Sequence, residues 1–297
     1  MSEYEETRRL ERGHKSNRMA GLPTVAWRQI NKGIVPTKSQ TTQIEFGCGM
    51  MEALGRVDEE LVRLAVDGPS FRLSENAAFM ESMAQTHAYT IFYGNVNQYP
   101  ERFTGLSYYY SSTTAASGAN VLLAGGSGSD NTSMWLVCWG DNTITGIYPR
   151  GSSYGIEHQD LGLQLVDDGT STGALYRAYV DQYKLKAGLA VRDWRYAARI
   201  ANIDLSDLAT AGDAADTSAN LIKLMIQAKN KIQNLNMGRC AWYCRNEIKT
   251  ALEIKAMNKG NVNLTIESLT NGTTVTKFLG IPIYRCDQLL ATEDLVS

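Results

Sequence analysis

The most regular apolar pattern of the chain lies in residues 74–93. Its stripe recurs at every fourth position and consists of Phe79, Met83, His87 and Ile91. This spacing is typical of one face of an α-helix. Ser74 can cap the helix, Glu75 suits its first turn, and Gly94 can end it. The pattern predicts a helix of about 19 residues and about 28 Å, with His87 packed in the core.

Alternating apolar and polar residues predict strands further along the chain. Residues 174–187 alternate and residues 188–203 continue the pattern, with arginines, lysines and aspartates interspersed. We interpret them as a two-stranded tongue with one buried face, whose arginines are solvated or paired between strands. Residues 133–138 and 143–148 predict a shorter strand pair joined by a turn at 140–142.

The C-terminal third changes character. After a linker at 209–216, the periodicity predicts a helix over 217–235, a buried strand over 239–244 and a second helix over 246–260. Two further strands follow, at 273–278 and 281–284. A helix–strand–helix block that ends in strands implies a compact α/β layer, and the chain as a whole is predicted to be α+β.

The N-terminal part of the chain is too polar to fold alone. Residues 1–20 mix acidic and basic side chains with few apolar ones, so they form either a solvated tail or a strap that orders against a neighbour. Residues 21–46 hold β-formers between glycines and prolines, which predicts an extended segment with turns. Trp27 and Ile30 need a partner surface on so short a segment.

Residues 41–67 predict a strand, a turn or short helix near Asp58-Glu59-Glu60, and a return near Val62. The stretch is highly charged. It is either a solvated hairpin or a charged loop that pairs with a neighbouring subunit.

The bulk composition excludes several classes of protein. With 43% hydrophobic and 20% charged residues the chain is ordinary globular protein. Its net charge of -2 lacks the basic excess of a specific nucleic-acid binder. Its apolar runs are too short to span a membrane, and its N-terminus lacks an apolar signal region. The five scattered cysteines argue against a disulfide framework and fit buried thiols in a reducing cytoplasm.

No motif for metal, cofactor or covalent chemistry emerges. His14, His87 and His158 are isolated, and Cys240 and Cys244 have no second ligand pair nearby. The glycine-rich tract 125–130 lacks the Gly-Lys-Ser/Thr ending of a phosphate loop, so we interpret it as a surface loop. We therefore predict no cofactor, no metal and no catalytic residues.

Two further features can be explained without a functional site. The acidic pairs Glu59/Glu60 and Asp167/Asp168 lie in charged loops, whereas a general acid needs a desolvated carboxylate. The strip of Arg192, Arg195 and Arg199 with aromatic neighbours can bind single strands, but a sheet face explains it equally well.

Several segments together resemble major capsid proteins of tailed bacteriophages with the Hong Kong 97-like fold, most closely those of short-tailed, podovirus-like phages. The segments are GLPTVAWRQINKGIVPTKSQT, FRLSENAAFMESMAQTHAYTIFYGN, NQYPERFTGLSYYY, NTSMWLVCWGDNTITGIYPRG, AYVDQYKLKAGLAVRDWRYAARIANID and GIPIYRCDQLL. The resemblance covers nearly the whole chain. It implies a structural protein that self-assembles into the icosahedral shell around the double-stranded DNA genome, and not an enzyme.

The resemblance also implies a division of the chain into named parts. These are an N-terminal arm at 1–36, an extended loop at 37–70, a peripheral domain with spine helix and β-tongue at 71–111 and 166–204, and an axial domain at 112–165 and 205–297. The helix–strand–helix block follows the tongue here, whereas it precedes the last peripheral strands in the type member, which suggests a permuted topology. Nothing identifies the lysine–asparagine cross-link of some family members.

The partners implied are other copies of the chain, in hexamers and pentamers, together with scaffolding, portal and decoration or cement proteins. The chain would lie near packaged DNA without specific binding, since a basic lining would hold DNA too tightly. It would be assembled in the host cytoplasm, make no membrane contact and end in the virion. The residues we predict to contact neighbouring subunits are Trp27, Arg28, Glu52, Arg56, Glu59, Glu60 and Arg63.

Two alternatives stay open at this point. A bacterial encapsulin-like compartment has the same fold, and a cargo enzyme encoded nearby would favour it. A soluble enzyme or carbohydrate-binding module would show a discrete pocket with a perturbed acid pair.

Overall fold

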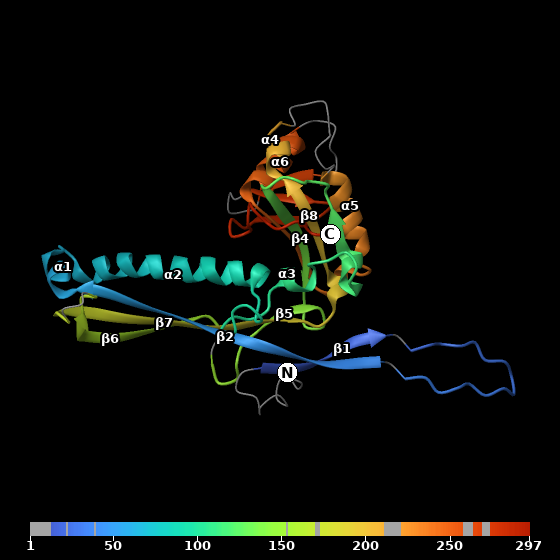
Figure 1. Cartoon of the computed structure of the whole chain (residues 1–297), viewed down its shortest axis with the longest axis horizontal. Helices are drawn as coiled ribbons and strands as arrows, with labels where there is room; N and C mark the ends of the chain where they lie inside the picture. The colour runs from blue at the N-terminus through green and yellow to red at the C-terminus, as the bar shows by residue number, and fades with distance from the viewer. Residues whose placement is uncertain are drawn as a thin grey trace.

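The computed structural model describes residues 13–21, 23–38, 40–152, 154–169, 173–210, 221–257, 264–268 and 274–297. The helices are α1 (Glu59–Leu64), α2 (Gly68–Tyr93), α3 (Leu106–Tyr109), α4 (Leu205–Thr210), α5 (Leu221–Lys231) and α6 (Asn246–Met257), with 3₁₀ turns η2 (Ala116–Asn120), η3 (Trp194–Tyr196) and η4 (Leu235–Met237). The strands are β1 (Gly13–Gly21), β2 (Gln40–Asp58), β3 (Val121–Leu123), β4 (Asn131–Trp139), β5 (Ile144–Ile147), β6 (Ile156–Asp167), β7 (Leu175–Val191), β8 (Ala197–Asp204), β9 (Arg239–Cys244), β10 (Leu264–Ser268), β11 (Thr274–Phe278) and β12 (Ile281–Arg285). Figure 1 shows an elongated lower layer, an upper domain that stands on it, and a hairpin that projects away from α1.

The lower layer is a long antiparallel sheet with α2 lying along it (Figure 1). β7 is its middle strand, with β2 on one side and β6 on the other. The helix buries only a narrow stripe, which consists of Asn76, Met83, Thr90 and Phe92. Most of its surface is therefore open to solvent in a single copy.

The predicted helix is confirmed but begins earlier, at Gly68. Asp67 caps it by accepting a hydrogen bond from the Ser70 N–H at 3.4 Å, and a proline lies in the first turn, so the start is stronger there than at Ser74. Gly94 ends it as predicted. A glycine is required at this position because a Cβ there would collide with the carbonyl oxygen of Phe103. His87 is half-buried, edge-on to Phe103, and burial lowers the pKa of its imidazole.

The predicted two-stranded tongue is wrong. β7 continues unbroken through Gly188 and pairs with β2, β5 and β6, whereas β8 pairs with β3 and β4. Gly188 is not a turn residue: a Cβ there would lie 2.7 Å from the Gly47 carbonyl oxygen, so the glycine permits close approach of β2. The alternation of apolar and polar residues specifies which face of a strand is buried, but it does not specify which strand lies beside it. The suggested permutation rested on the order of the blocks along the chain and stays a prediction.

Two other predicted returns of the chain are also wrong. The strand pair 133–138 and 143–148 is absent as a hairpin, because β4 is held on both sides by β8 and β9, and β5 meets it in parallel only at Trp139 and Ile144. Near Val62 the chain enters α1 and then α2 rather than returning as a strand. The strand before it and the short helix at 59–64 are confirmed.

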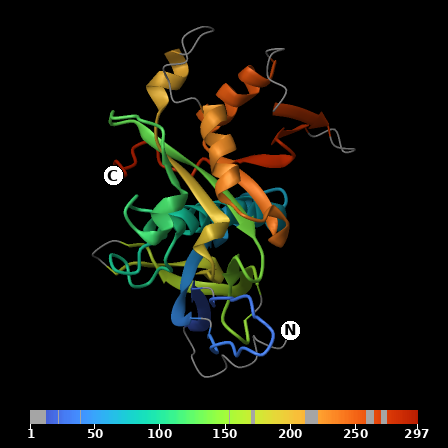
Figure 2. The same ribbon diagram turned by 90° about the vertical axis from the view of Figure 1, so that its right-hand side faces the viewer.

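The upper domain is an α/β layer, as predicted. β4 lies between β8 and β9, and β12 joins β9 in parallel. Alternate residues of β4 enter two cores: Met134 and Leu136 face α5 and α6, whereas Trp135 and Val137 face the end of α2. Figure 2 shows α5 lying against the strands. The predicted strand at 239–244 and the helix from Asn246 are confirmed; most of the predicted linker, and residues 1–12, lie outside the described residues.

Cys138 and Cys240 face each other in the β4–β9 register and form a disulfide. The prediction that the cysteines are thiols is wrong for this pair, because its partners are 102 residues apart in sequence and only strand pairing brings them together. Cys244 is buried, and Cys48 and Cys286 are half-buried thiols whose pKa values are raised by burial.

We predict that the chain purified without reductant and then unfolded titrates three thiols with a chromogenic disulfide reagent, since two of its five cysteines are bonded. The same sample reduced before titration should give five. Peptide mapping should recover Cys138 linked to Cys240. Five thiols in the unreduced sample would contradict the pairing.

Candidate subunit contact surfaces

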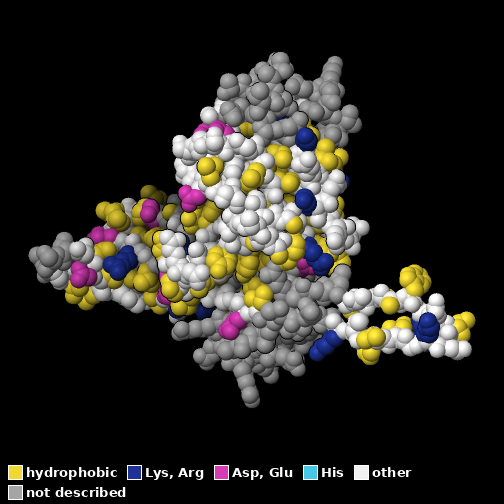
Figure 3. Space-filling view, turned by 45° about the vertical axis from the view of Figure 1, so that its right-hand side comes forward, with side chains coloured by type: hydrophobic (Ala, Val, Ile, Leu, Met, Phe, Trp, Pro, Cys, Tyr) yellow, Lys and Arg dark blue, Asp and Glu magenta, His cyan; other side chains and the backbone are white. Residues whose placement is uncertain are grey.

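The projecting hairpin exposes apolar side chains at its tip, residues 23–38. β1 and β2 pair from Gly13 with Gly47 to Gly21 with Gln40, and the tip lies beyond the last pair. Val25, Trp27, Ile30 and Val35 are each at least 80% exposed. The tip carries Arg28, Lys32 and Lys38 and no acidic residue. Figure 3 shows hydrophobic and basic side chains on it.

The tip has local structure of its own. The Thr37 hydroxyl donates to the Thr24 carbonyl oxygen at 2.9 Å and joins its two sides. A turn brings the Lys32 N–H to the Gln29 carbonyl oxygen at 3.2 Å, with Asn31 in the left-handed region at φ 62°. The exposed tryptophan is thus carried on a shaped loop at the end of a hairpin that projects away from the rest of the ribbon in Figure 1.

The opposite end of the lower layer is both apolar and acidic. Its exposed apolar residues are Leu61, Leu64, Val66, Leu73, Leu165 and Leu175. Its charged residues are the acids Asp58, Glu59, Glu60, Asp67, Asp167 and Asp168 and the bases Arg56, Arg63 and Arg177. We call this set the acidic end.

The structure places the predicted contact residues in three regions. Trp27 and Arg28 lie in the tip, Glu52 lies midway along β2, and the other four gather at the acidic end, where Arg56 donates to the Asp167 carbonyl oxygen at 3.3 Å. The acidic end contains ion pairs within the chain: Arg63–Glu59 and Arg63–Glu60 at 2.9 Å, and Arg177–Glu59 at 3.3 Å. Glu52 lies 3.8 Å from Lys184. Such surface pairs contribute little stability. Contact with a neighbour stays a prediction for all seven residues.

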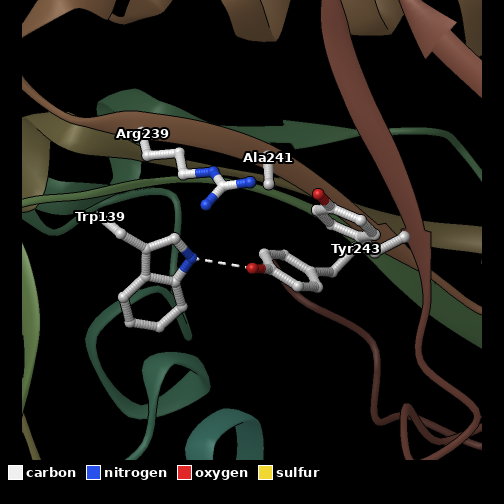
Figure 4. Close-up of a pocket in the computed structure, with 5 residues that line it drawn as sticks. Trp139, Arg239, Ala241 and Tyr243 are labelled. Atoms are coloured by element: carbon white, nitrogen blue, oxygen red, sulfur yellow. Dashed lines mark hydrogen bonds between the residues drawn. The ribbon is translucent and has the colours of Figure 1, made fainter. Parts of the chain in front are cut away.

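A hollow of about 330 Å³ lies on the upper sheet, lined by Trp139, Arg239, Ala241, Tyr243 and Tyr284. Figure 4 shows the Arg239 guanidinium above the rings of Trp139 and Tyr243. The Trp139 indole N–H donates a hydrogen bond to the Tyr243 hydroxyl oxygen at 2.9 Å. The hollow contains no pair of acids and no nucleophile beside a base. Within the described ranges, no three His, Cys, Asp or Glu side chains gather as metal ligands would.

The chain matches the family model "Major capsid protein GP7" over residues 7–297. It belongs to this family of major capsid proteins. It is 36% identical to the capsid chain in the structure of bacteriophage Epsilon15, covering 97% of this chain and 86% of that one with a TM-score of 0.69. Weaker similarity extends to the capsid of bacteriophage JBD30, at 10% identity, 93% and 86% coverage and a TM-score of 0.48. No curated protein matches significantly.

The capsid protein is therefore a structural subunit of an icosahedral phage head and is located in the virion. The Hong Kong 97-like fold and the capsid identity inferred from the quoted segments are confirmed. The encapsulin alternative gains no support from the comparisons. Among the helices of the described residues, none is long and apolar enough to cross a membrane.

Two buried polar clusters of the capsid protein were not predicted. In the first, Asp181 on β7 accepts hydrogen bonds from Arg72 and Asn76 of α2, at 3.0 Å each, and lies 2.8 Å from the His158 ring on β6. In the second, Arg199 on β8 binds Glu293 of the C-terminal segment at 2.8 Å. The i, i+4 pair Arg72 and Asn76 was a signal available in the sequence. The others meet only through tertiary pairing.

The suspected arginine strip is not a surface. Arg199 is 4% exposed and bound to Glu293, and Arg195 pairs with Asp193 at 2.6 Å. The alternative explanation, a position in the sheet, is correct for Arg199 in β8, whereas Arg195 lies in the 3₁₀ turn η3 that precedes this strand.

Proposed function

We propose that copies of the capsid protein join head to tail, with the tip of one copy lying on the acidic end of the next. The observation that carries this proposal is Trp27, which is fully exposed on a projecting loop. Exposing the apolar ring of a tryptophan to water is unfavourable, and burying the ring against a partner surface is favourable. The acidic end offers exposed leucines, and its acids outnumber its bases by six to three.

The polarity of this contact has a geometric consequence. The tip and the acidic end are different surfaces at opposite ends of the molecule (Figure 1). A contact between unlike surfaces is heterologous, and it closes into a ring when the rotation between copies permits. We propose that this contact closes the rings of five and six copies that the family resemblance implies. Many weak contacts then add to a stable shell through multivalency.

The seven predicted residues take different roles in this arrangement. Trp27 inserts among the leucines of the acidic end, and Arg28 faces its carboxylates. Glu59 and Glu60 attract the basic tip, and Arg63 positions both acids from the same surface. Arg56 binds the Asp167 carbonyl oxygen beside them. Glu52 lies along the path between the two ends of the lower layer. We further propose that the lower layer is the peripheral domain and the upper layer the axial domain. β6 begins within the predicted axial range and β8 within the predicted peripheral one, so the boundaries at 165 and 204 move accordingly.

The remaining partners follow from the family. We propose a scaffolding protein, a portal, decoration or cement proteins, packaged DNA held without specific contacts, and assembly in the host cytoplasm. The net charge of -2 supports the loose relation to DNA, because few counterions would be released on contact. A purely structural role without enzymatic activity agrees with the absence of any catalytic motif in the sequence.

The tip is tested by Trp27→Ala. We expect the concentration at which half of the chain is in shells, measured by light scattering and electron microscopy, to rise by about tenfold or more, since a buried aromatic anchor contributes about 2 kcal/mol or more to an interface. Tyr154→Ala removes an aromatic side chain that is 69% exposed elsewhere and should assemble as the unaltered chain does. Arg28→Glu and Glu60→Arg should each impair assembly, and their combination should restore part of it. Normal assembly of Trp27→Ala would refute the contact.

A further inference from the structure

Arg239 is a cation without a partner in the part of the chain that the structure describes. It opens β9, directly opposite Trp139 in the β4–β9 register. Its guanidinium extends across the hollow above the rings of Trp139 and Tyr243 (Figure 4). Two other arginines of the upper domain form ion pairs within the chain: Arg245 with Glu247 at 3.0 Å and Arg285 with Asp287 at 2.6 Å. Arg239 is different because its surroundings are aromatic.

The walls of the hollow are held in place before anything binds. The Trp139 and Tyr243 rings meet edge to face at 88° with centroids 6.4 Å apart, and the indole N–H donates to the Tyr243 oxygen. Tyr284 lies against Tyr243 with centroids 6.0 Å apart. With its oxygen already accepting one hydrogen bond, the Tyr243 hydroxyl has its own proton to donate. Burial raises the pKa of this phenol, so the hydroxyl stays protonated.

We propose that this hollow receives an acidic side chain from a second copy of the capsid protein. A carboxylate can accept two parallel hydrogen bonds from a guanidinium, and the aromatic walls make the pair stronger by displacing water. The hollow has room for one or two side chains and lies at the lower limit of small-molecule sites. The proposal adds a contact between upper domains to the head-to-tail contact and rests only on the assembly of copies into a shell.

Charge complementarity favours a second copy as the occupant. The upper domain itself presents exposed acids, of which Asp141 and Asp294 make no hydrogen bond or ion pair in the described part of the chain. Asp294 precedes Leu295, which is 53% exposed and could cover an aromatic wall. In a closed shell each upper domain is surrounded by others, so such acids are present at high local concentration.

The test compares charge variants of the full chain under conditions in which the unaltered chain forms shells. We expect Arg239→Glu to raise the concentration for half-assembly by about tenfold or more, because it places two carboxylates together. Arg239→Lys keeps the charge and should assemble within a few-fold of the unaltered chain. Lys231→Glu makes the same charge change at the end of α5, which packs on the other face of the upper sheet, and should assemble normally.

Circular dichroism and thermal unfolding of the unassembled variants separate assembly from folding. If Arg239→Glu unfolds, Arg239→Gln replaces it in the same comparison. In a cryo-EM map of the unaltered shells, a carboxylate of another copy should lie within ion-pair distance of Arg239. Normal assembly of Arg239→Glu, an equal defect in Lys231→Glu, or a hollow that is empty or filled by DNA or another protein would overturn the proposal. None of these outcomes tests the head-to-tail contact, which is tested separately by Trp27→Ala.

Discussion

Replacing Arg199 with methionine is expected to lower the free energy of unfolding of the unassembled capsid protein by about 3–5 kcal/mol. Arg199 is 4% exposed, and its guanidinium binds three partners: the Glu293 carboxylate at 2.8 Å, the Ser133 hydroxyl at 2.9 Å and the Tyr110 carbonyl oxygen at 2.9 Å. Removing it leaves a buried carboxylate without its counter-charge, which is far more costly than removing an exposed ion pair.

The hydrogen bonds of Glu293 explain why the effect spreads across the molecule. Glu293 also accepts hydrogen bonds from the hydroxyls of Ser133 and Tyr93. Burial and the negative charge of Glu293 raise the pKa of Tyr93 above its ordinary value, so that hydroxyl keeps its proton. Tyr93 ends α2, Arg199 lies in β8, and Glu293 lies in the C-terminal segment. The cluster therefore ties the lower layer, the upper sheet and the chain end together.

Urea unfolding measures the loss, and a double-mutant cycle identifies its cause. The variant Arg199→Met/Glu293→Met should be more stable than Arg199→Met alone, because it no longer buries an unpaired charge. Arg285→Met serves as the matched control, since its ion pair with Asp287 is exposed to solvent and should contribute little to stability. A loss in Arg199→Met no larger than in this control would contradict the role assigned to the cluster.

Replacing Asp181 with asparagine is expected to lower the free energy of unfolding by about 2–3 kcal/mol at neutral pH. The Asp181 carboxylate is 1% exposed and accepts hydrogen bonds from Arg72 and Asn76, while His158 lies 2.8 Å away. It is the main polar link between the first half of α2 and the strands beneath. An asparagine cannot supply the charge that Arg72 requires there.

The pH dependence of this loss has a definite sign. Burial alone would raise the pKa of Asp181, but the hydrogen bonds from Asn76, His158 and Arg72 outweigh burial and lower it below the ordinary 3.8. A carboxyl group whose pKa is lower in the folded state stabilises the fold above the unfolded-state value. That contribution is lost as pH falls through the folded-state value.

Stability curves from pH 7 down to about pH 2.5 test this dependence, with the folded-state pKa lying below 3.8. The difference between the unaltered chain and Asp181→Asn should be constant above about pH 4.5 and should shrink below the ordinary value. Asp160→Asn removes the other acid near Arg72, which is 49% exposed, and should cost less than about 1 kcal/mol. A difference that grows as pH falls would refute the assignment.

Local features of the sequence were sufficient to predict those elements whose formation depends on residues close together along the chain. The stripe from Phe79 to Ile91 predicted α2, and Gly94 predicted its end, because capping and helical spacing act over a few residues. Strand β9 and the start of α6 were predicted for the same reason. The exposed Trp27 was singled out because so short a segment cannot bury it.

Pairing across long separations could not be predicted. The alternation of 174–203 was correct, but period-two spacing identifies a buried face and not the strand that covers its edge. The same limit hid the disulfide of Cys138 with Cys240, the ion pair of Arg199 with Glu293, and the bonds of Asp181. Each joins residues that are far apart in sequence and become neighbours only in the folded sheet.

The sequence by itself determined that this protein is a shell subunit, since its segments resemble capsid proteins over nearly the whole chain and contain no catalytic motif. The tertiary structure decided which surfaces a copy can offer to its neighbours. It places Trp27 and the acidic end at opposite extremes of the lower layer, and among the residues it describes it gives Arg239 aromatic neighbours and no acidic partner. The physical reason is that composition and periodicity act locally, whereas an interface depends on which distant side chains the sheet brings to one surface.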